Sequence, residues 1–498
     1  MPLHGGITTA NWLVFNPANY YTEGNQLEGL PMINWYADLP PIKPKYRAIT
    51  QLIKRLIEDD KLLPGQRLPA ERELAQLLKV DRSTVTRAFL ELTANGLLIK
   101  KTGSGTYVST LPQIASQADK VNWNFFLENT ESRGDQAYQQ RLLQARALDH
   151  GALIDGAANE LPMGLIPELG ALQLDWHGFL LAQKQEQDAG YQPLIHTIGQ
   201  IHTNKKQFHL ANQTLIIAGG AQQSLLLVLR SLLQVGDAVA FARPSYFNSS
   251  AIFQATGIHT YPVPLTSDGL DLAALEEAIL KHRIKLLIMN PTFQNPTGSI
   301  LTLEQRQRIL KLCQSYQIPI VEDDVFGWLV AKQDEVPTFK SLAPENVIYL
   351  SSLSKLLGSS TRIGWIVAPQ AIGQRLLQVQ KKLDIVPSML AQVMANLALN
   401  NASFEPEISK LTAQLSHRRD QVTAIFRECR PDWRFTTPKG GFYLWVTQDD
   451  PDIFNQLLAQ KILVKPGPIY GTDKRSFRFN FAGIDAKKQQ QLRERLKN

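Results

Sequence analysis

The chain has 498 residues, too many for one hydrophobic core, so we expect two or three domains. Its apolar content of 44% and charged content of 19% are those of an ordinary globular protein. Cys313 and Cys429 are its two cysteines. This argues against a disulfide framework or a cysteine-based metal site, and it favours a reducing compartment. Without a signal-peptide pattern or a membrane-length apolar stretch, a cytoplasmic protein is expected.

The positive charge is concentrated in one segment. The formal net charge is +7, and residues 41–110 hold 13 Lys and Arg against 7 Asp and Glu. Nearly all of the excess therefore lies in about a seventh of the chain. Such a segment is either a solvated basic surface or an electrostatic footprint for nucleic acid. Residues 1–40, an N-terminal extension rich in aromatic residues, carry no assignable function.

Residues 41–110 predict three helices followed by a β-hairpin. Apolar residues recur at helical spacing from Tyr46, and Pro69 opens a second helix over residues 70–78. Asp81 is a plausible N-cap for a third helix that runs to about Asn95. After Gly96, residues 97–108 read as two strands joined by a basic, glycine-rich tip.

The third helix has two different sides. Its expected inner side is apolar: Val85, Ala88, Phe89 and Leu92. Its expected outer side carries Ser83, Thr86 and Arg87, with Arg82 at the start. Hydroxyls and arginines suit contacts with phosphates and base edges in a major groove. The alternative is a helical hairpin that docks on another protein, but the polar outer side and the basic hairpin favour DNA.

This segment resembles the winged helix-turn-helix of the GntR family. The motifs that carry the resemblance are Leu68-Pro69-Ala70-Glu71-Arg72-Glu73-Leu74-Ala75, Val80-Asp81-Arg82-Ser83-Thr84-Val85 and Gly103-Ser104-Gly105-Thr106-Tyr107-Val108. The resemblance implies binding of double-stranded DNA. The implied DNA contacts are Arg72, Arg82, Ser83, Thr84, Thr86, Lys100, Lys101 and Gly105. Asp60 replaces the glycine that the family usually has, with little expected consequence because aspartate tolerates a left-handed backbone.

A second, larger domain follows a linker. Residues 111–150 lack a clear core pattern and are expected to be a linker with some helix. Residues 151–498 alternate apolar strands with helical patterns, which predicts an α/β domain with a mostly parallel central sheet. Ligands of such sheets bind beyond the carboxyl ends of the strands.

Several polar or aromatic residues follow these predicted strands. The run Ala218-Gly-Gly-Ala-Gln-Gln-Ser-Leu225 places free N–H groups at a helix start, where an anion could bind, although a glycine-rich turn is often only a tight turn. Tyr246 could stack on a ring or belong to the core. Asn295, the asparagine of the second of two Asn-Pro steps in residues 290–296, could donate to a phenolic oxygen.

Two further motifs indicate a specific chemistry. Glu322-Asp323-Asp324 ends a buried strand in three carboxylates, and a buried carboxylate needs a cationic partner such as a protonated pyridine nitrogen. Lys355 lies in Ser351-Ser-Leu-Ser-Lys355, and Arg362 follows. An amine among hydroxyls, with a guanidinium nearby, can carry an aldehyde cofactor and bind its phosphate. This is the chemistry of pyridoxal 5'-phosphate (PLP).

The larger domain resembles fold-type I aminotransferases, and the whole chain resembles the MocR-type regulators, in which a GntR module precedes such a domain. The resemblance implies a small C-terminal α+β subdomain and a homodimer. It also implies that Lys355 forms the Schiff base, Asp323 pairs with the pyridine nitrogen and Asn295 binds the phenolic oxygen. The other implied residues are Tyr246 for ring stacking, Ala221, Gln222, Ser352 and Arg362 for the phosphate, and Arg478 for a substrate α-carboxylate.

One departure bears on activity. Phe326 replaces a tyrosine that commonly donates to the phenolic oxygen. The leading hypothesis from the whole resemblance is a PLP-dependent transcription regulator that senses an amino acid, another amine or PLP itself. The alternative is a working aminotransferase with an accessory DNA-binding module, and Phe326 slightly favours the regulator. Tyr191 matches less well the tyrosine that reaches the partner subunit's phosphate, because Gln192 follows it instead of glycine.

Overall fold

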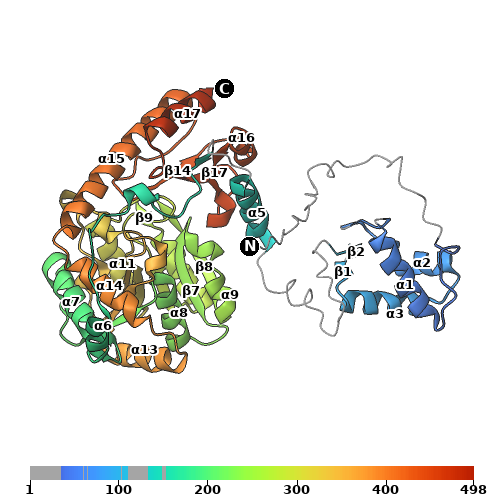
Figure 1. Ribbon diagram of the computed structural model, residues 1–498, viewed down its shortest axis with the longest axis horizontal. Coiled ribbons are helices and arrows are strands. Elements are labelled where there is room, and N and C mark those ends of the chain that lie inside the picture. Colours follow the sequence, from blue (N-terminus) through green and yellow to red (C-terminus); the bar gives the residue numbers. More distant parts are fainter. Residues whose placement is uncertain are drawn as a thin grey trace, which may run out of the picture. The chain divides into compact units, whose positions relative to one another are not determined.

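The computed structural model describes residues 35–59, 61–63, 65–101, 104–109, 133–147 and 153–497. The chain divides into two compact units, Met1–Glu131 and Ser132–Asn498 (Figure 1). Each unit has its own hydrophobic core. Among the described helices, none has both the length and the apolarity needed to cross a bilayer.

The first unit consists of three helices and a hairpin, as the sequence predicts. These are α1 (Lys45–Glu58), α2 (Glu71–Leu78), α3 (Arg82–Ala94), β1 (Leu98–Lys101) and β2 (Gly105–Val108). The strands pair antiparallel with Leu98 opposite Val108. The expected inner side of α3 is buried against α1 and α2. Asp81 occupies the N-cap position of α3, but its side chain makes no capping hydrogen bond. Asp60 and the tip residues 102–103 lie outside the described residues.

The second unit is built on an eight-stranded sheet. Its strands are β6 (Gln213–Ala218), β7 (Ala238–Arg243), β8 (His259–Thr266), β9 (Gly269–Leu270), β10 (Leu286–Met289), β11 (Ile320–Asp323), β12 (Val347–Ser352) and β13 (Gly364–Pro369). Their order is β6-β13-β12-β11-β10-β7-β8-β9. β13 runs antiparallel to both of its neighbours, and the short β9 is also antiparallel. The remaining pairs are parallel, which confirms the expected mostly parallel sheet.

Helices cover both faces of this sheet (Figure 1). They are α6 (Trp176–Gln183), α7 (Gln192–Lys206), α8 (Ala221–Leu232), α9 (Ala251–Thr256), α10 (Leu272–His282), α11 (Leu303–Ser315), α12 (Phe339–Leu342), α13 (Gln370–Lys382) and α14 (Met389–Leu399). Successive side chains of β10 enter different cores, Leu287 and Met289 on one face and Leu286 and Ile288 on the other. This explains why the strand is a continuous apolar run, since parallel sheets are buried on both faces.

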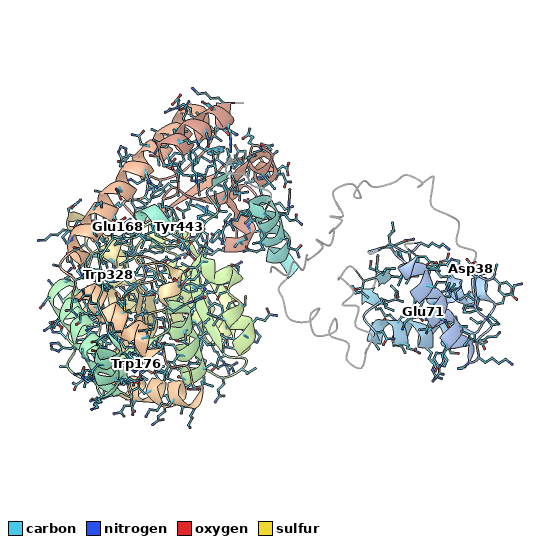
Figure 2. All side chains as sticks on the ribbon, in the orientation of Figure 1. Asp38, Glu71, Glu168, Trp176, Trp328 and Tyr443 are labelled. Atoms are coloured by element: carbon cyan, nitrogen blue, oxygen red, sulfur yellow. The ribbon has the colours of Figure 1, made fainter. Side chains whose placement is uncertain are left out.

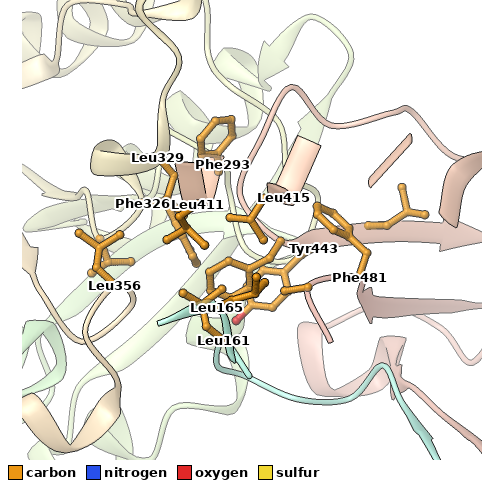
Figure 3. Close-up of a cluster of buried hydrophobic side chains, with 14 of the residues drawn as sticks. Leu161, Leu165, Phe293, Phe326, Leu329, Leu356, Leu411, Leu415, Tyr443 and Phe481 are labelled. Carbon is orange, nitrogen blue, oxygen red and sulfur yellow. The ribbon is translucent and has the colours of Figure 1, made fainter. Parts of the chain in front are cut away.

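A smaller α+β subdomain ends the chain, as the resemblance implies. It contains α15 (Phe404–Cys429), β14 (Tyr443–Thr447), α16 (Ile453–Ala459), β16 (Lys465–Pro466), β17 (Ser476–Asn480) and α17 (Ala486–Lys497), with strand order β14-β17-β16. Two-residue strands also pair, β3 (Ile154–Asp155) with β15 (Ile462–Leu463) and β4 (Glu186–Gln187) with β5 (Gly190–Tyr191). Figure 3 shows Phe326 beside Leu411 of α15, and both belong to one core cluster together with Leu356 and Leu415.

A helix lies within the segment expected to be a linker. This helix, α5 (Arg133–Ala147), belongs to the second unit. Leu142 is buried, and the ring of Tyr138 packs edge-on against Phe454 with centroids 5.2 Å apart. Arg146 forms an ion pair with Asp155, with N–O distances of 2.8 and 3.1 Å. The α5 helix is therefore packed onto the C-terminal subdomain rather than being a free connection.

Candidate functional site

The expected cofactor residues come together at one edge of the large sheet. Because β6, β7, β10, β11 and β12 are parallel, their carboxyl ends lie at the same edge. Ala221 follows β6, Tyr246 follows β7, and Asn295 follows β10. Asp323 is the last residue of β11, and Lys355 comes three residues after β12. Sequence positions more than 130 residues apart thus contribute to one site.

A polar cradle forms at the start of α8. Gly220 has φ = 97°, a conformation that favours glycine, and a Cβ there would lie 3.8 Å from the hydroxyls of Ser352 and Ser354. A Cβ on Gly364 would lie 2.8 Å from the Cα of Gly220, so glycine permits this close approach. The free N–H groups of the helix start and two hydroxyls suit a phosphate. Ser354 was not among the phosphate-binding residues expected from the sequence.

Arg362 lies near this cradle in sequence and has an unusual backbone. Its φ is 48°, in the left-handed region, and the residue is exposed. Within the described part of the chain its guanidinium makes no hydrogen bond or ion pair. The side chain is thus free to bind an anion.

Asp323 is buried and only partly satisfied. Its Oδ2 accepts a hydrogen bond from the hydroxyl of Tyr246, and its Oδ1 has no partner among the described residues. Burial is the largest cause that raises the pKa of Asp323 to about 7, and the charge of Asp324 adds to it. The hydrogen bond from Tyr246 and the charge of Lys355 oppose this rise. A cation next to Oδ1 would satisfy the carboxylate.

The other two carboxylates of the run have partners elsewhere. Glu322 lies 3.4 Å from the guanidinium of Arg306, with both side chains 0% exposed. It also accepts hydrogen bonds from the backbone N–H groups of residues 339 and 340. Asp324 pairs with Lys206 and accepts a 2.7 Å hydrogen bond from Tyr349. Oδ1 of Asp324 also has no partner among the described residues, but Lys206 already neutralises that carboxylate. Asp323 forms no ion pair with a described residue, so it is the carboxylate left for a cationic ligand.

Asn290, which was not among the expected site residues, positions two of them. Its amide nitrogen donates to the backbone oxygen of Asp323 at 2.7 Å, and its side-chain oxygen accepts from the backbone N–H of Asn295 at 2.9 Å. The side-chain oxygen of Asn295 in turn accepts from Arg478 at 3.3 Å. Asn290 therefore links the ends of β10 and β11, and Asn295 links both to Arg478.

Lys355 points toward a segment that precedes the large sheet. Its ammonium donates to the backbone oxygen of Asn159 at 2.7 Å, and it lies 6.0 Å from the ring centroid of Phe326. Phe326 is buried, with its ring against Phe442 and Tyr443. The hydroxyl of Tyr443 donates to the same oxygen of Asn159 at 2.9 Å (labelled in Figure 2). Phe326 itself therefore offers no hydroxyl to a ligand, and the hydroxyl of Tyr443 is bound to Asn159.

Arg478 projects from β17 and is 1% exposed. Its Nη2 donates to the backbone oxygen of Ala158 and to Oδ1 of Asn159, both at 2.8 Å, and its Nε has no partner among the described residues. The guanidinium also lies 3.9 Å from the ring centroid of Tyr443. Residues 157–159 thus occupy the guanidinium edge that would otherwise bind a carboxylate. This contact was not predicted.

Three of the expected DNA-binding residues of the first unit contact Glu71 (labelled in Figure 2). Glu71 accepts a 2.9 Å hydrogen bond from Thr86 and lies 3.2 Å from Lys100 and 3.4 Å from Arg82. Burial raises the pKa of Glu71, but the hydrogen bonds from Thr86 and Lys100 outweigh it, so this pKa lies below its usual range. The side chains of Arg82 and Lys100 remain 70% and 66% exposed.

The other expected contacts divide into exposed and half-buried residues. Arg72 and Ser83 are exposed, whereas Thr84 is half-buried. Arg72, Arg82 and Thr84 line one hollow together with Lys45 and Lys79. The side chain of Lys101 lies outside the described residues, and Gly105 begins β2 with φ = 123°. Arg87, a candidate for the outer side, instead stacks 4.1 Å from the ring centroid of Tyr46.

Comparison with known proteins identifies both units. Residues 157–496 match the model of the aminotransferase class I and II family, and residues 45–108 match that of the GntR family of bacterial regulatory proteins. The chain belongs to the aminotransferase class I and II family. Its first unit is a GntR-type helix-turn-helix, so the chain has the architecture of the MocR-like regulators.

Two bacterial transcription regulators and one solved aminotransferase are similar to this chain over most of their length. The HTH-type transcriptional regulator YisV of Bacillus subtilis is 29% identical over 91% of this chain and 95% of its own. The regulator NorG of Staphylococcus aureus is 29% identical over 84% of this chain and 95% of its own. The kynurenine aminotransferase of Pyrococcus horikoshii, solved with PMP, has a TM-score of 0.65 and 24% identity over 74% of this chain and 93% of its own.

The residues at the sheet edge fit PLP, the cofactor of this family. The unpartnered Oδ1 of Asp323 suits a protonated ring nitrogen, the cradle before α8 suits a phosphate, and Lys355 supplies an amine. When bound, PLP supplies an aldehyde carbon for a lysine and a ring that withdraws electrons from an attached amine. The family match therefore confirms the expected cofactor, PLP, and the positions of these residues are compatible with its binding.

Proposed function

We propose that this protein is a PLP-dependent transcription regulator of the cytoplasm. Its first unit binds operator DNA, and its second unit binds PLP at Lys355 and responds to an amine. The observation that carries the proposal is the unsatisfied carboxylate oxygen of Asp323, buried at the sheet edge from which Lys355 extends, in a chain whose residues 45–108 match the GntR family. A buried carboxylate without a cationic partner is costly, and a cofactor ring cation offsets the cost.

Each site residue has a proposed task. Lys355 holds the cofactor covalently, and Asp323 keeps a proton on the ring nitrogen. Ala221, Gln222, Ser352 and Arg362 bind the phosphate, as expected from the sequence, with Ser354 added by the geometry. Asn295 donates to the phenolic oxygen while Tyr246 orients Asp323 and covers the ring. Arg478 binds the α-carboxylate of the amine through two parallel hydrogen bonds.

A ligand at Arg478 would reach the linker helix through a continuous set of contacts. A carboxylate on this guanidinium competes with the oxygens of Ala158 and Asn159. The same segment is tied to Asp155, whose Oδ1 accepts from the N–H of Ala157 at 3.0 Å. Asp155 is paired with Arg146 of α5. If the ligand binds one arrangement of residues 155–159 more tightly than another, it shifts the equilibrium between the two arrangements. Because Asp155 is paired with Arg146, such a shift can change the position of α5, the first described helix of the second unit.

We also propose a homodimer. Trp176 is 72% exposed on α6, and Leu181 on the same helix is 48% exposed. The α6 helix packs on α14, whose Leu390 is 51% exposed, and Leu383 and Val386 precede that helix with similar exposure. Large apolar side chains exposed on neighbouring elements mark an association surface. A dimer would present two DNA-binding units to two half-sites.

Operator binding by the PLP-loaded protein, measured by fluorescence anisotropy with and without amino acids, tests the proposal. The regulator account expects DNA affinity to change with one amine in the wild type. It expects Arg146→Ala to bind the same amine without this change. An aminotransferase would instead turn over an amino donor with 2-oxoglutarate at roughly 1–1000 per second. Turnover in that range without any effect on DNA would overturn the proposed function.

A further inference from the structure

Lys465 lies directly opposite Arg478 on two neighbouring antiparallel strands, β16 and β17. Residues in this relationship project from the same face of a sheet with Cβ atoms about 4.5–5.5 Å apart. The face is the one that meets the site, because Arg478 and Asn480 both bond to residues 157–160 from it. The intervening Phe479 points into the core on the other face. Lys465 therefore belongs to the wall of the ligand site, beside the carboxylate-binding arginine.

The charges around Lys465 are mostly of its own sign. Burial, followed by the charges of Arg478, Arg146 and Lys355, lowers the pKa of Lys465 to about 7. Asp155 alone opposes this shift, and Arg146 already pairs with that carboxylate. Lys465 is only partly exposed, and it makes no hydrogen bond or ion pair within the described part of the chain. A cation placed in this way costs stability unless an anion joins it.

Another buried lysine shows how this fold satisfies a purely structural ammonium. Lys340 is 1% exposed and donates to Oε1 of Gln213 at 2.6 Å and to the backbone oxygens of Pro344 and Val347 at 2.7 Å. All three of its protons have acceptors. Lys465 has none among the described residues, although it lies next to a binding site. A structural role would also be served by an apolar residue of similar length, without the cost of the charge.

We propose that Lys465 binds a second acidic group of the amine ligand, so that the site selects amino compounds with two acidic groups. The α-carboxylate binds Arg478, and the distal carboxylate binds the ammonium of Lys465. This inference rests on the proposed function, because it concerns the ligand of the same PLP site. It narrows the effector from any amine to a dicarboxylic amino acid or a close acidic analogue.

The first experiment compares charged ligands with neutral ligands of the same shape. Absorbance titrations of the PLP-loaded protein measure the affinity for L-glutamate against L-glutamine and for L-aspartate against L-asparagine. The acidic member of at least one pair should bind about 10-fold to 100-fold more tightly than its amide. This ratio of affinities corresponds to the free energy of one hydrogen bond to a charged group. Equal affinities within both pairs would overturn the inference while leaving the proposed function intact.

Variants then assign this preference to one residue. Lys465→Met should remove the preference for the acidic ligand and leave the affinity for its amide unchanged. Lys465→Arg should retain the preference, because it retains the cation. Lys487→Met removes an exposed lysine of α17 and should behave like the wild type. If Lys465→Met weakened the acid and the amide equally, both cations would bind the one α-carboxylate, and the inference would be wrong.

A second measurement avoids the amine chemistry of the cofactor. Calorimetric titration with glutarate and with its monoamide reports carboxylate binding by ligands that have no amino group. Glutarate should bind more tightly to the wild type, and Lys465→Met should abolish the difference. If the protein failed to take up PLP, the proposed function would fail, whereas a lysine-dependent preference for glutarate would still support an anion site at Lys465. Equal binding of the two probes would count against that site.

Discussion

The hydroxyl of Tyr246 donates a hydrogen bond to Oδ2 of Asp323, while Oδ1 of the same carboxylate has no partner among the described residues. Tyr246 thereby fixes which oxygen is available to a ligand. The hydrogen bond also keeps the pKa of Asp323 lower than burial alone would make it. Tyr246 thus has an orienting role in addition to the stacking role that the sequence suggested.

Substitution of this pair should weaken cofactor binding to different degrees. Asp323→Asn removes the charge that would pair with the ring nitrogen, and we expect PLP affinity to fall by about 10-fold to 100-fold. Tyr246→Phe removes one hydrogen bond, and we expect a loss of about two-fold to ten-fold. Equilibrium dialysis of the apo variants against PLP measures both. An unchanged affinity in Asp323→Asn would rule out its proposed pairing.

The buried pair Arg306–Glu322 should support the fold rather than the chemistry. Both side chains are 0% exposed, and Arg306 also donates to Thr292 at 3.0 Å. Arg306→Met leaves the carboxylate of Glu322 without its cation in the interior, which should reduce the free energy of unfolding by about 3–5 kcal/mol.

Denaturant unfolding of the second unit measures this loss. Lys281→Ala, which breaks an exposed pair with Glu277 on α10, is the matched control and should cost under about 0.5 kcal/mol. A similar loss of unfolding free energy in the two variants would show that burial does not determine how much these ion pairs stabilise the fold.

Glu71 should contribute to operator selectivity, because it touches two exposed cations and a hydroxyl of the expected DNA-binding surface. Glu71→Gln removes a negative charge and releases Arg82 and Lys100 from their fixed positions. We expect affinity for non-operator DNA to rise, since phosphate contacts are electrostatic. The ratio of operator to non-operator affinity should fall about ten-fold, because positioned side chains read the bases.

Anisotropy titrations with operator and scrambled duplexes at one salt concentration give this ratio. Arg82→Ala provides the comparison, since it should weaken operator binding without altering cofactor absorbance. A Glu71→Gln protein with an unchanged ratio would contradict the positioning role.

The affinity for an acidic ligand should depend on pH through Lys465. The groups that act on it are Arg478 of β17, Arg146 of α5, Lys355 and Asp155 of β3. Its pKa of about 7 means that the free protein loses the ammonium as pH rises above 7. Since only the protonated form binds a carboxylate, glutarate affinity should fall about five-fold between pH 7 and pH 8. Lys465→Arg should abolish this dependence; its persistence there would implicate another group.

The sequence predicted the motif-bearing parts of the molecule. The winged helix-turn-helix follows from apolar spacing and turn residues around Gly96, and the site residues that follow the strands come together because parallel strands end at one edge. Tyr443, Lys465 and residues 157–159 were not found. They approach the site from segments far apart in sequence, and no local pattern marks them.

The sequence also could not predict which of the three carboxylates, Glu322, Asp323 and Asp324, have a cationic partner. This pairing depends on the alternation of side chains along β11 and on two cations, Arg306 from α11 and Lys206 from α7. The packing of α5 is a second example. Its Gln-rich sequence has a weak apolar stripe, so the contact of Leu142 and Tyr138 with the C-terminal subdomain could be seen only in three dimensions.

The visible absorbance of purified protein incubated with PLP, compared between wild type and Lys355→Ala, tests the central claim most directly. Excess cofactor is removed by gel filtration before the spectrum is recorded, and circular dichroism checks that the variant is folded. We expect a retained band from the lysine-bound cofactor in the wild type and none in Lys355→Ala. A wild-type protein that stayed colourless, or a variant that kept the same band, would contradict the account.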